Sequence, residues 1–171
     1  MSAIENTYER LVALLSSRIG EGLALLATRV ALAGIFWRAG RTKVVEGTTL
    51  QIDEIQYFIF DNEFSGLPLS SDIAVPLATY AEHFFPILLV LGLATRFSAL
   101  SLGIMTLAIQ VFVFPEAFWQ THLLWFAMAG VLLSRGAGIF SLDTVLGYLR
   151  SASLEPAVPT IAPSLASAHP A

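Results

Sequence analysis

The chain has 171 residues, of which 56% are hydrophobic and 13% are charged, and its formal net charge is −4. Soluble domains carry about 25% charged residues, so this composition indicates one integral membrane domain. The negative charge argues against nucleic-acid binding, and the lack of cysteine excludes disulfides, iron–sulfur clusters and thiolate metal sites.

The first 21 residues read as an amphipathic segment. A helix over residues 4–19 would place four apolar side chains on one face: Tyr8, Leu11, Leu15 and Ile19. Glutamates interrupt the segment, which is not typical of a cleaved signal peptide. We expect residues 1–21 to lie in the membrane interface. The alternative is a soluble extension of the first span.

Four apolar stretches follow, and each is long enough to reach roughly across a membrane core of about 30 Å. They are Gly22–Gly40, Ile73–Leu93, Phe97–Phe114 and Phe118–Ser134. We therefore predict an all-α, multi-pass integral membrane four-helix bundle over residues 22–149.

Positive charges predict the orientation of this bundle. One side carries Arg10, Arg18, Arg96, Arg135 and Arg150, whereas the other carries Arg41 and Lys43. By the positive-inside rule, both termini are expected in the cytoplasm. The long loop 41–72 between spans one and two is then outside, and its aromatic residues are expected to fold onto the membrane surface or to cap the bundle.

Residues 150–171 are rich in Ala, Ser and Pro, which favours disorder.

Glu82 and His83 lie side by side in the middle of the second span. An ionisable pair at membrane depth is costly and is usually functional. Arg29 is expected about 10 Å and Glu82 about 16 Å from the cytoplasmic edge. We predict a buried Arg29–Glu82 ion pair. In one interpretation, Glu82 exchanges a proton and Arg29 tunes its pKa. In the other, the ion pair only fixes the register of the two helices.

Further polar residues are candidates for ligand binding. Arg38, Gln110 and His122 are expected in the outer third of the bilayer, and Tyr80 shares a helical face with His83. Carboxyl, imidazole and phenol groups suit a quinone headgroup, although helix–helix hydrogen bonds are the alternative for each histidine. Arg38 alternatively extends to the interface.

No metal site is expected. His83 and His122 differ in depth by about 9 Å, which is too far for two axial ligands of one haem iron. No ligand-spacing motif for another metal is present.

The sequence resembles the DoxX family of small four-span membrane proteins over about residues 22–149. The resemblance is carried by LVLGLATRFSAL at 89–100, RGAGIFSLDTVLG at 135–147, and Gly40 with Lys43 three residues later. It extends to an acid in span two and an arginine in span one, and it implies that Glu82, Arg29 and Arg96 are the family's polar positions. A Gly-rich stretch often follows the acid in that family, whereas His83 and three bulky residues follow it here.

The family takes its name from a subunit associated with a quinone-linked oxidase and thiosulfate:quinone oxidoreductase. The resemblance therefore implies a bacterial inner-membrane protein of a redox or stress-response system.

One hypothesis is a quinone-interacting subunit that serves a partner redox protein, with quinone as the cofactor. A second is a non-catalytic anchor or assembly subunit. A third is a small transporter or metal-stress accessory that uses the outer-half histidines. Besides the bilayer, the expected partner is a redox subunit or a second copy of the chain. If it is an enzyme, it is at most a subunit of a quinone-linked oxidoreductase.

Overall fold

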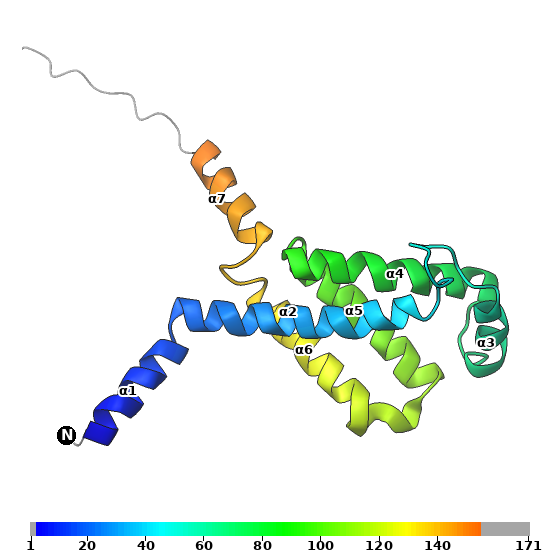
Figure 1. Ribbon diagram of the computed structural model, residues 1–171, viewed down its shortest axis with the longest axis horizontal. Coiled ribbons are helices and arrows are strands. Elements are labelled where there is room, and N and C mark those ends of the chain that lie inside the picture. Colours follow the sequence, from blue (N-terminus) through cyan, green and yellow to red (C-terminus); the bar gives the residue numbers. More distant parts are fainter. Residues whose placement is uncertain (1–2, 155–171) are drawn as a thin grey trace, which may run out of the picture.

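The computed structural model describes residues 3–154, and these form an all-helical structure (Figure 1). The elements are α1 (Ala3–Leu15), α2 (Arg18–Arg41), α3 (Ile55–Glu63), α4 (Ser71–Leu91), α5 (Thr95–Phe112), the 3-10 helix η1 (Pro115–Ala117), the π-helical turn η2 (Phe118–His122), α6 (Leu123–Arg135) and α7 (Leu142–Leu154). Within the described residues, β pairing is confined to one isolated bridge between Val44 and Ile52. The prediction of an all-α fold is confirmed.

Within residues 3–154, four segments are long and apolar enough to cross a membrane: α2, α4, α5 and the stretch Pro115–Arg135. The first three agree with the predicted spans to within four residues at each end. The fourth begins irregularly, with Pro115 as the first residue of a 3-10 helix. A π-helical turn then leads into α6. The chain is a multi-pass membrane protein with four apolar helices.

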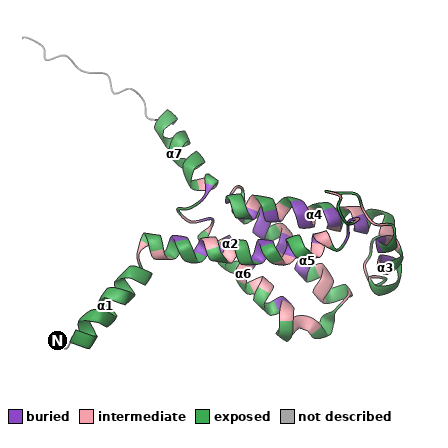
Figure 2. Ribbon diagram, in the orientation of Figure 1, coloured by how far each residue is buried: buried purple, intermediate pink, exposed green. Residues whose placement is uncertain are grey.

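The four long segments pack as a bundle in which α2 lies mainly against α4, and α5 lies mainly against α6. Its core contains large apolar side chains from all four segments, including Leu32, Phe36, Leu89, Leu102 and Leu132. Figure 2 shows the buried residues along the facing sides of α2, α4 and α5. The remaining faces of the long helices are apolar and exposed, as expected of helices surrounded by lipid.

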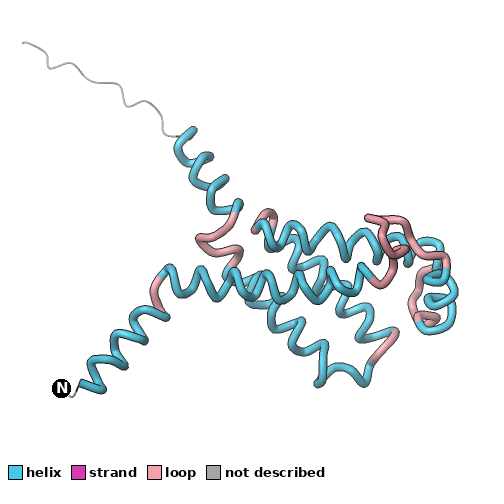
Figure 3. The backbone as a smooth tube through the Cα atoms, in the orientation of Figure 1, coloured by secondary structure: helices cyan, strands magenta, loops and turns pink. Residues whose placement is uncertain are grey.

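The bundle has two different ends. Helices α1 and α7 leave it at one end, where α2 begins and α4 turns into α5; we call this the terminal end (Figure 1). Helix α3 and its connections cover the opposite end, which we call the loop end (Figure 3). The glycine of the α4–α5 turn, Gly92, adopts φ +67° and ends α4 with a left-handed residue.

The 41–72 loop contains a helix that the sequence did not reveal. Helix α3 packs against the first half of α4, where Phe60, Ala74 and Val75 form a second buried cluster. Ile52, Tyr57, Phe64 and Ala78 surround it. The aromatic residues of this loop thus cover one end of the bundle, which was one of the two expected arrangements.

The two terminal helices bury little. Helix α1 has no buried residue, and its interfacial placement stays a prediction. Helix α7 continues through residues 150–154, which the composition had assigned to a disordered tail. The rest of that tail, including His169, lies outside the described residues.

Candidate functional site

Glu82 pairs with Lys43, not with Arg29. The Lys43 ammonium lies 2.7 Å from Glu82 Oε2, and both side chains are buried. The contact is an ion pair rather than a well-directed hydrogen bond. Lys43 also donates a hydrogen bond of 3.3 Å to the carbonyl of Ala39 at the end of α2. The predicted Arg29–Glu82 pair is wrong, because the chain after α2 folds back and brings a loop lysine to the buried carboxylate.

His83 lies next to this pair and has unused bonding capacity. It is 5% exposed, and its Nδ1 lies 2.7 Å from the carbonyl oxygen of Thr79. A carbonyl oxygen only accepts, so Nδ1 carries the hydrogen of this bond. Nε2 is buried and has no hydrogen-bond partner among the described residues. Buried polar atoms without a partner are rare and call for an explanation.

Gly40 brings α2 into close contact with the Glu82–His83 segment. A Cβ atom at this position would lie 2.8 Å from His83 Cε1 and 3.0 Å from Glu82 Cβ. One turn earlier, the ring of Trp37 meets the His83 ring edge to face with centroids 5.1 Å apart. A larger residue at position 40 would therefore push these polar side chains away from α2.

The loop that carries Lys43 is held by hydrogen bonds. Arg41 Nη1 donates to the carbonyls of Thr48 and Thr49 at 3.0 and 3.1 Å. The carbonyl of Lys43 accepts from the N–H of Asp53, and Gln56 Nε2 donates to the carbonyl of Thr42. These bonds close a short loop over the end of α2 and position Lys43 before any ligand arrives.

Arg29 lies near the other end of the bundle and bonds to backbone carbonyls. Its Nη1 donates to Leu89 and Val90 at 3.2 and 3.4 Å, and Nη2 donates to Phe140. Its Nε has no partner in the described part of the chain. Arg29 thus connects α2 to the end of α4 and to the segment after α6, and it is separate from Glu82.

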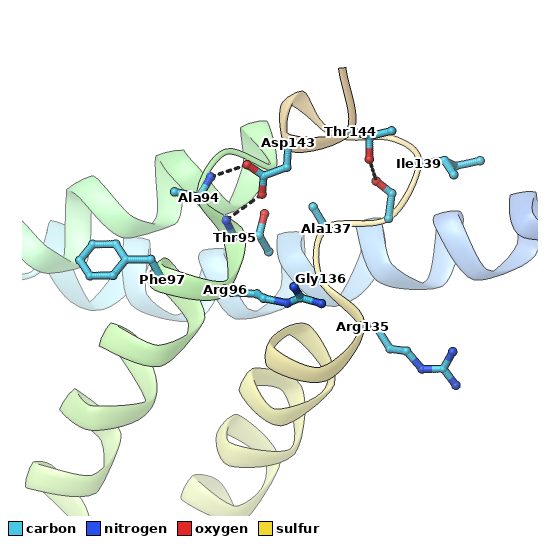
Figure 4. Close-up of a pocket in the computed structure, with 11 residues that line it drawn as sticks. Ala94, Thr95, Arg96, Phe97, Arg135, Gly136, Ala137, Ile139, Asp143 and Thr144 are labelled. Atoms are coloured by element: carbon cyan, nitrogen blue, oxygen red, sulfur yellow. Dashed lines mark hydrogen bonds between the residues drawn. The ribbon is translucent and has the colours of Figure 1, made fainter. Parts of the chain in front are cut away.

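The two sequence segments that carried the family resemblance meet at this terminal end (Figure 4). Both carboxylate oxygens of Asp143 accept backbone N–H groups, from Ala94 at 2.8 Å and Thr95 at 2.9 Å. Arg96 donates to the carbonyls of Leu133 and Ser134. Asp143 therefore caps the first turn of α5, and Arg96 satisfies carbonyls at the end of α6.

The other predicted site residues divide into two groups. Gln110 and His122 contact each other, with His122 Nδ1 2.6 Å from Gln110 Oε1, and Gln110 Nε2 donates to the carbonyl of Pro115. Tyr80 is half-exposed and Arg38 is exposed. The structure thus places both Glu82 and His83 against Gly40, keeps Gln110 and His122 as a separate pair, and leaves Tyr80 half exposed on the outer surface.

Metal binding receives no structural support among the described residues. They contain no group of three or more His, Cys, Asp or Glu side chains that could hold a metal ion.

Sequence reasoning missed Lys43 and Trp37 as members of the site. From the sequence, Lys43 is recognised only as a positive charge of the outer side and in the family pattern with Gly40, and that spacing is the available signal. With Glu82 and His83 they form what we call the loop-end site: Trp37, Gly40, Lys43, Thr79, Glu82 and His83. It combines a buried ion pair with an imidazole nitrogen that is free to bond.

Comparison with known proteins agrees with this architecture. Residues 24–115, more than half of the chain, match the family model of DoxX. An uncharacterized protein of Haemophilus influenzae is 32% identical over 135 residues, which cover 75% of this chain and 86% of that protein. No solved structure matches significantly. The chain belongs to the DoxX family.

Proposed function

We propose that this DoxX protein is a quinol-interacting subunit of a membrane redox system, and that the loop-end site holds the quinol headgroup. The observation that carries this proposal is the buried His83 Nε2, which lacks a partner beside the Glu82–Lys43 ion pair. A site that only fixed helix packing would gain stability by bonding this atom or by replacing it with an apolar group.

The tautomer of His83 determines whether a ligand must donate or accept a hydrogen bond at Nε2. Because Nδ1 carries the hydrogen bonded to Thr79, the neutral ring presents Nε2 as an acceptor. An acceptor in an apolar setting suits a hydroxyl donor, which the reduced headgroup supplies. A bound quinol would also supply two protons and two electrons to a redox reaction.

The neighbours of His83 suit the handling of a proton. His83 Nε2 would accept the hydroxyl hydrogen bond of a bound quinol and then one of its two protons, and the second proton would leave to water at the loop end. The Glu82 carboxylate, the preceding residue, would stabilise the resulting imidazolium. The Lys43 ammonium lies 2.7 Å from Glu82 Oε2 and holds the carboxyl group in place. The electrons pass to a partner redox protein.

Access from the membrane is consistent with the position of Trp37. This side chain contacts the His83 ring, and 40% of its surface is exposed on the outside of the bundle. Tyr80, one turn before His83, is exposed as well. An aromatic surface of this kind suits the flat ring of a lipid-soluble quinol that arrives from the bilayer.

The proposal includes a location. We place the protein in the bacterial inner membrane with the terminal end in the cytoplasm, because most arginines outside the spans gather at that end. The loop-end site then faces the outer side of the membrane.

The test is the quinone content of protein purified from its native membrane in mild detergent. Solvent extraction should recover about one quinone per chain from the unaltered protein. Glu82→Gln and His83→Phe should lose most of it, whereas Tyr80→Phe should keep it. Thermal unfolding of each variant checks that the fold is intact. If no form of the protein carries quinone and all are equally folded, the proposal is wrong, and the anchor hypothesis takes its place.

A further inference from the structure

A second site lies at the terminal end, far from the loop-end site. An open pocket of about 510 Å³ lies between the start of α5 and the segment that joins α6 to α7 (Figure 4). Thr95, Arg96 and Phe97 line it from α5, and Gly136, Ile139 and Asp143 line it from the opposite side. The proposed function uses none of these residues.

Two polar groups in this pocket have capacity for a ligand. Arg96 uses Nε and Nη2 to bond the carbonyls of Leu133 and Ser134, and these two bonds occupy two of its five N–H donors. Thr95 Oγ1 is buried in a residue that is 1% exposed, and it has no hydrogen-bond partner among the described residues. Each of these groups can donate a hydrogen bond to an anionic oxygen atom.

The charges around the pocket leave one cation uncompensated. Arg135 pairs with Glu21 at 2.9 Å, and its side chain points away from Arg96 (Figure 4). Asp143 accepts the backbone N–H groups of Ala94 and Thr95. Arg96 has no carboxylate within ion-pair distance in the part of the chain that the structure describes. An anion would complement it.

The surface below the pocket indicates that this anion is attached to a lipid. Five apolar residues of α5 recur at intervals of three or four and are each about half exposed: Phe97, Leu100, Ile104, Leu107 and Val111. This stripe starts at the pocket wall and runs along the membrane-crossing helix. Thr95 is the first residue of that helix, so the pocket lies at the depth of the lipid headgroups.

We propose that this pocket binds the phosphate group of a membrane phospholipid. Arg96 and Thr95 Oγ1 hold the phosphate, and the acyl chains lie along the exposed stripe of α5. Such a lipid would connect the start of α5 with the segment after α6, close to the point where Asp143 bonds the first turn of α5.

Native mass spectrometry of the detergent-solubilised chain tests this proposal. Protein incubated with phosphatidylglycerol should retain one tightly bound lipid, and Arg96→Gln should weaken this binding about tenfold, the effect of losing a charge-assisted hydrogen bond. Arg18→Gln removes the same charge from an exposed residue at the same end and should leave the affinity unchanged. Equal weakening in both variants would show unspecific attraction to the headgroup and would overturn the site.

A second variant separates lipid binding from structural support by Arg96. Thr95→Val keeps the shape of the side chain and removes only the unpartnered hydroxyl. It should lower the lipid affinity severalfold, whereas Thr106→Val should not, because the Thr106 hydroxyl donates to the carbonyl of Leu102 within α5. If Thr95→Val keeps the lipid and makes the protein more stable, the hydroxyl serves no ligand and the proposal is wrong.

The same experiment distinguishes lipid phosphate from free phosphate. Inorganic phosphate at millimolar concentration should compete poorly with phosphatidylglycerol, because it cannot contact the apolar stripe. Retention of inorganic phosphate without retention of lipid would assign the pocket to a soluble anion and contradict the lipid proposal.

Discussion

The two ends of the bundle both hold charged groups that bond within the protein, but the bonding differs. At the terminal end, Arg29 donates to three backbone carbonyls and Asp143 accepts two backbone N–H groups. At the loop end, Glu82 contacts one ammonium group, and a nitrogen of His83 has no partner. The first arrangement closes the ends of helices, whereas the second leaves an imidazole free to bind. The same types of residue thus build a structural junction at one end and a candidate ligand site at the other.

The largest expected effect is at the structural junction. Arg29→Met would remove a fully buried side chain and leave the carbonyls of Leu89, Val90 and Phe140 without this donor. We expect the free energy of unfolding to fall by about 3–5 kcal/mol, as for other broken buried charge networks. Unfolding in detergent with increasing dodecyl sulfate measures it. A loss below about 1 kcal/mol would contradict the structural role of Arg29.

The next effect concerns the partner of Glu82. In a double-mutant cycle, Lys43→Met and Glu82→Gln should each destabilise the protein, and the double variant should recover part of the loss. We expect a coupling energy of about 2 kcal/mol. The matched cycle of Arg29→Gln with Glu82→Gln should be additive, because these residues bond to different groups. Coupling in the second cycle and additivity in the first would reverse the assignment.

A smaller effect is expected at the contact between α2 and α4. Gly40→Ala would place a Cβ atom 2.8 Å from His83, so the free energy of unfolding should fall by about 1–2 kcal/mol. Gly34→Ala on the same helix serves as the control. Its added Cβ atom would meet no atom within 4 Å, so the free energy of unfolding should not fall. The same unfolding titration compares the two. Equal stability of both variants would mean that α2 does not approach His83 this closely.

The smallest effect is expected at the exposed pair of the terminal end. Glu21→Gln would break the ion pair with Arg135, whose side chains are largely exposed. Such pairs contribute less than about 1 kcal/mol and are screened by salt. Thermal unfolding at low and high salt should show a small difference that disappears at high salt. A loss that persists at high salt would show that the pair has a larger structural role.

Much of the fold follows from the hydrophobic pattern. Long apolar stretches can satisfy their backbone groups in a membrane only as helices, so three spans were predicted within a few residues. Helix α3 and the π-helical turn were not foreseen, because nine residues of a polar-aromatic loop and a five-residue turn have no clear periodicity.

The site was predicted only in part. Glu82 and His83 were identified because ionisable residues in an apolar span are costly. The ion-pair partner was wrong because the depth argument treated residues 41–72 as outside the bundle, whereas this loop inserts Lys43 beside Glu82. A buried charged side chain also need not pair with another side chain. Arg29 instead bonds to backbone carbonyls at the end of a helix. Every residue has a carbonyl, so the sequence does not indicate which carbonyls an arginine will bond.

Quenching of Trp37 fluorescence tests the loop-end site most directly, because this ring touches His83. Trp119→Phe with Trp125→Phe leaves Trp37 as the remaining tryptophan of the three in the chain. Titration with a short-chain benzoquinol, kept reduced, should quench it along a saturating curve, and Glu82→Gln should shift the midpoint about tenfold to higher concentration. Quenching that rises linearly, and equally with and without Glu82→Gln, would contradict a quinone site at the loop end.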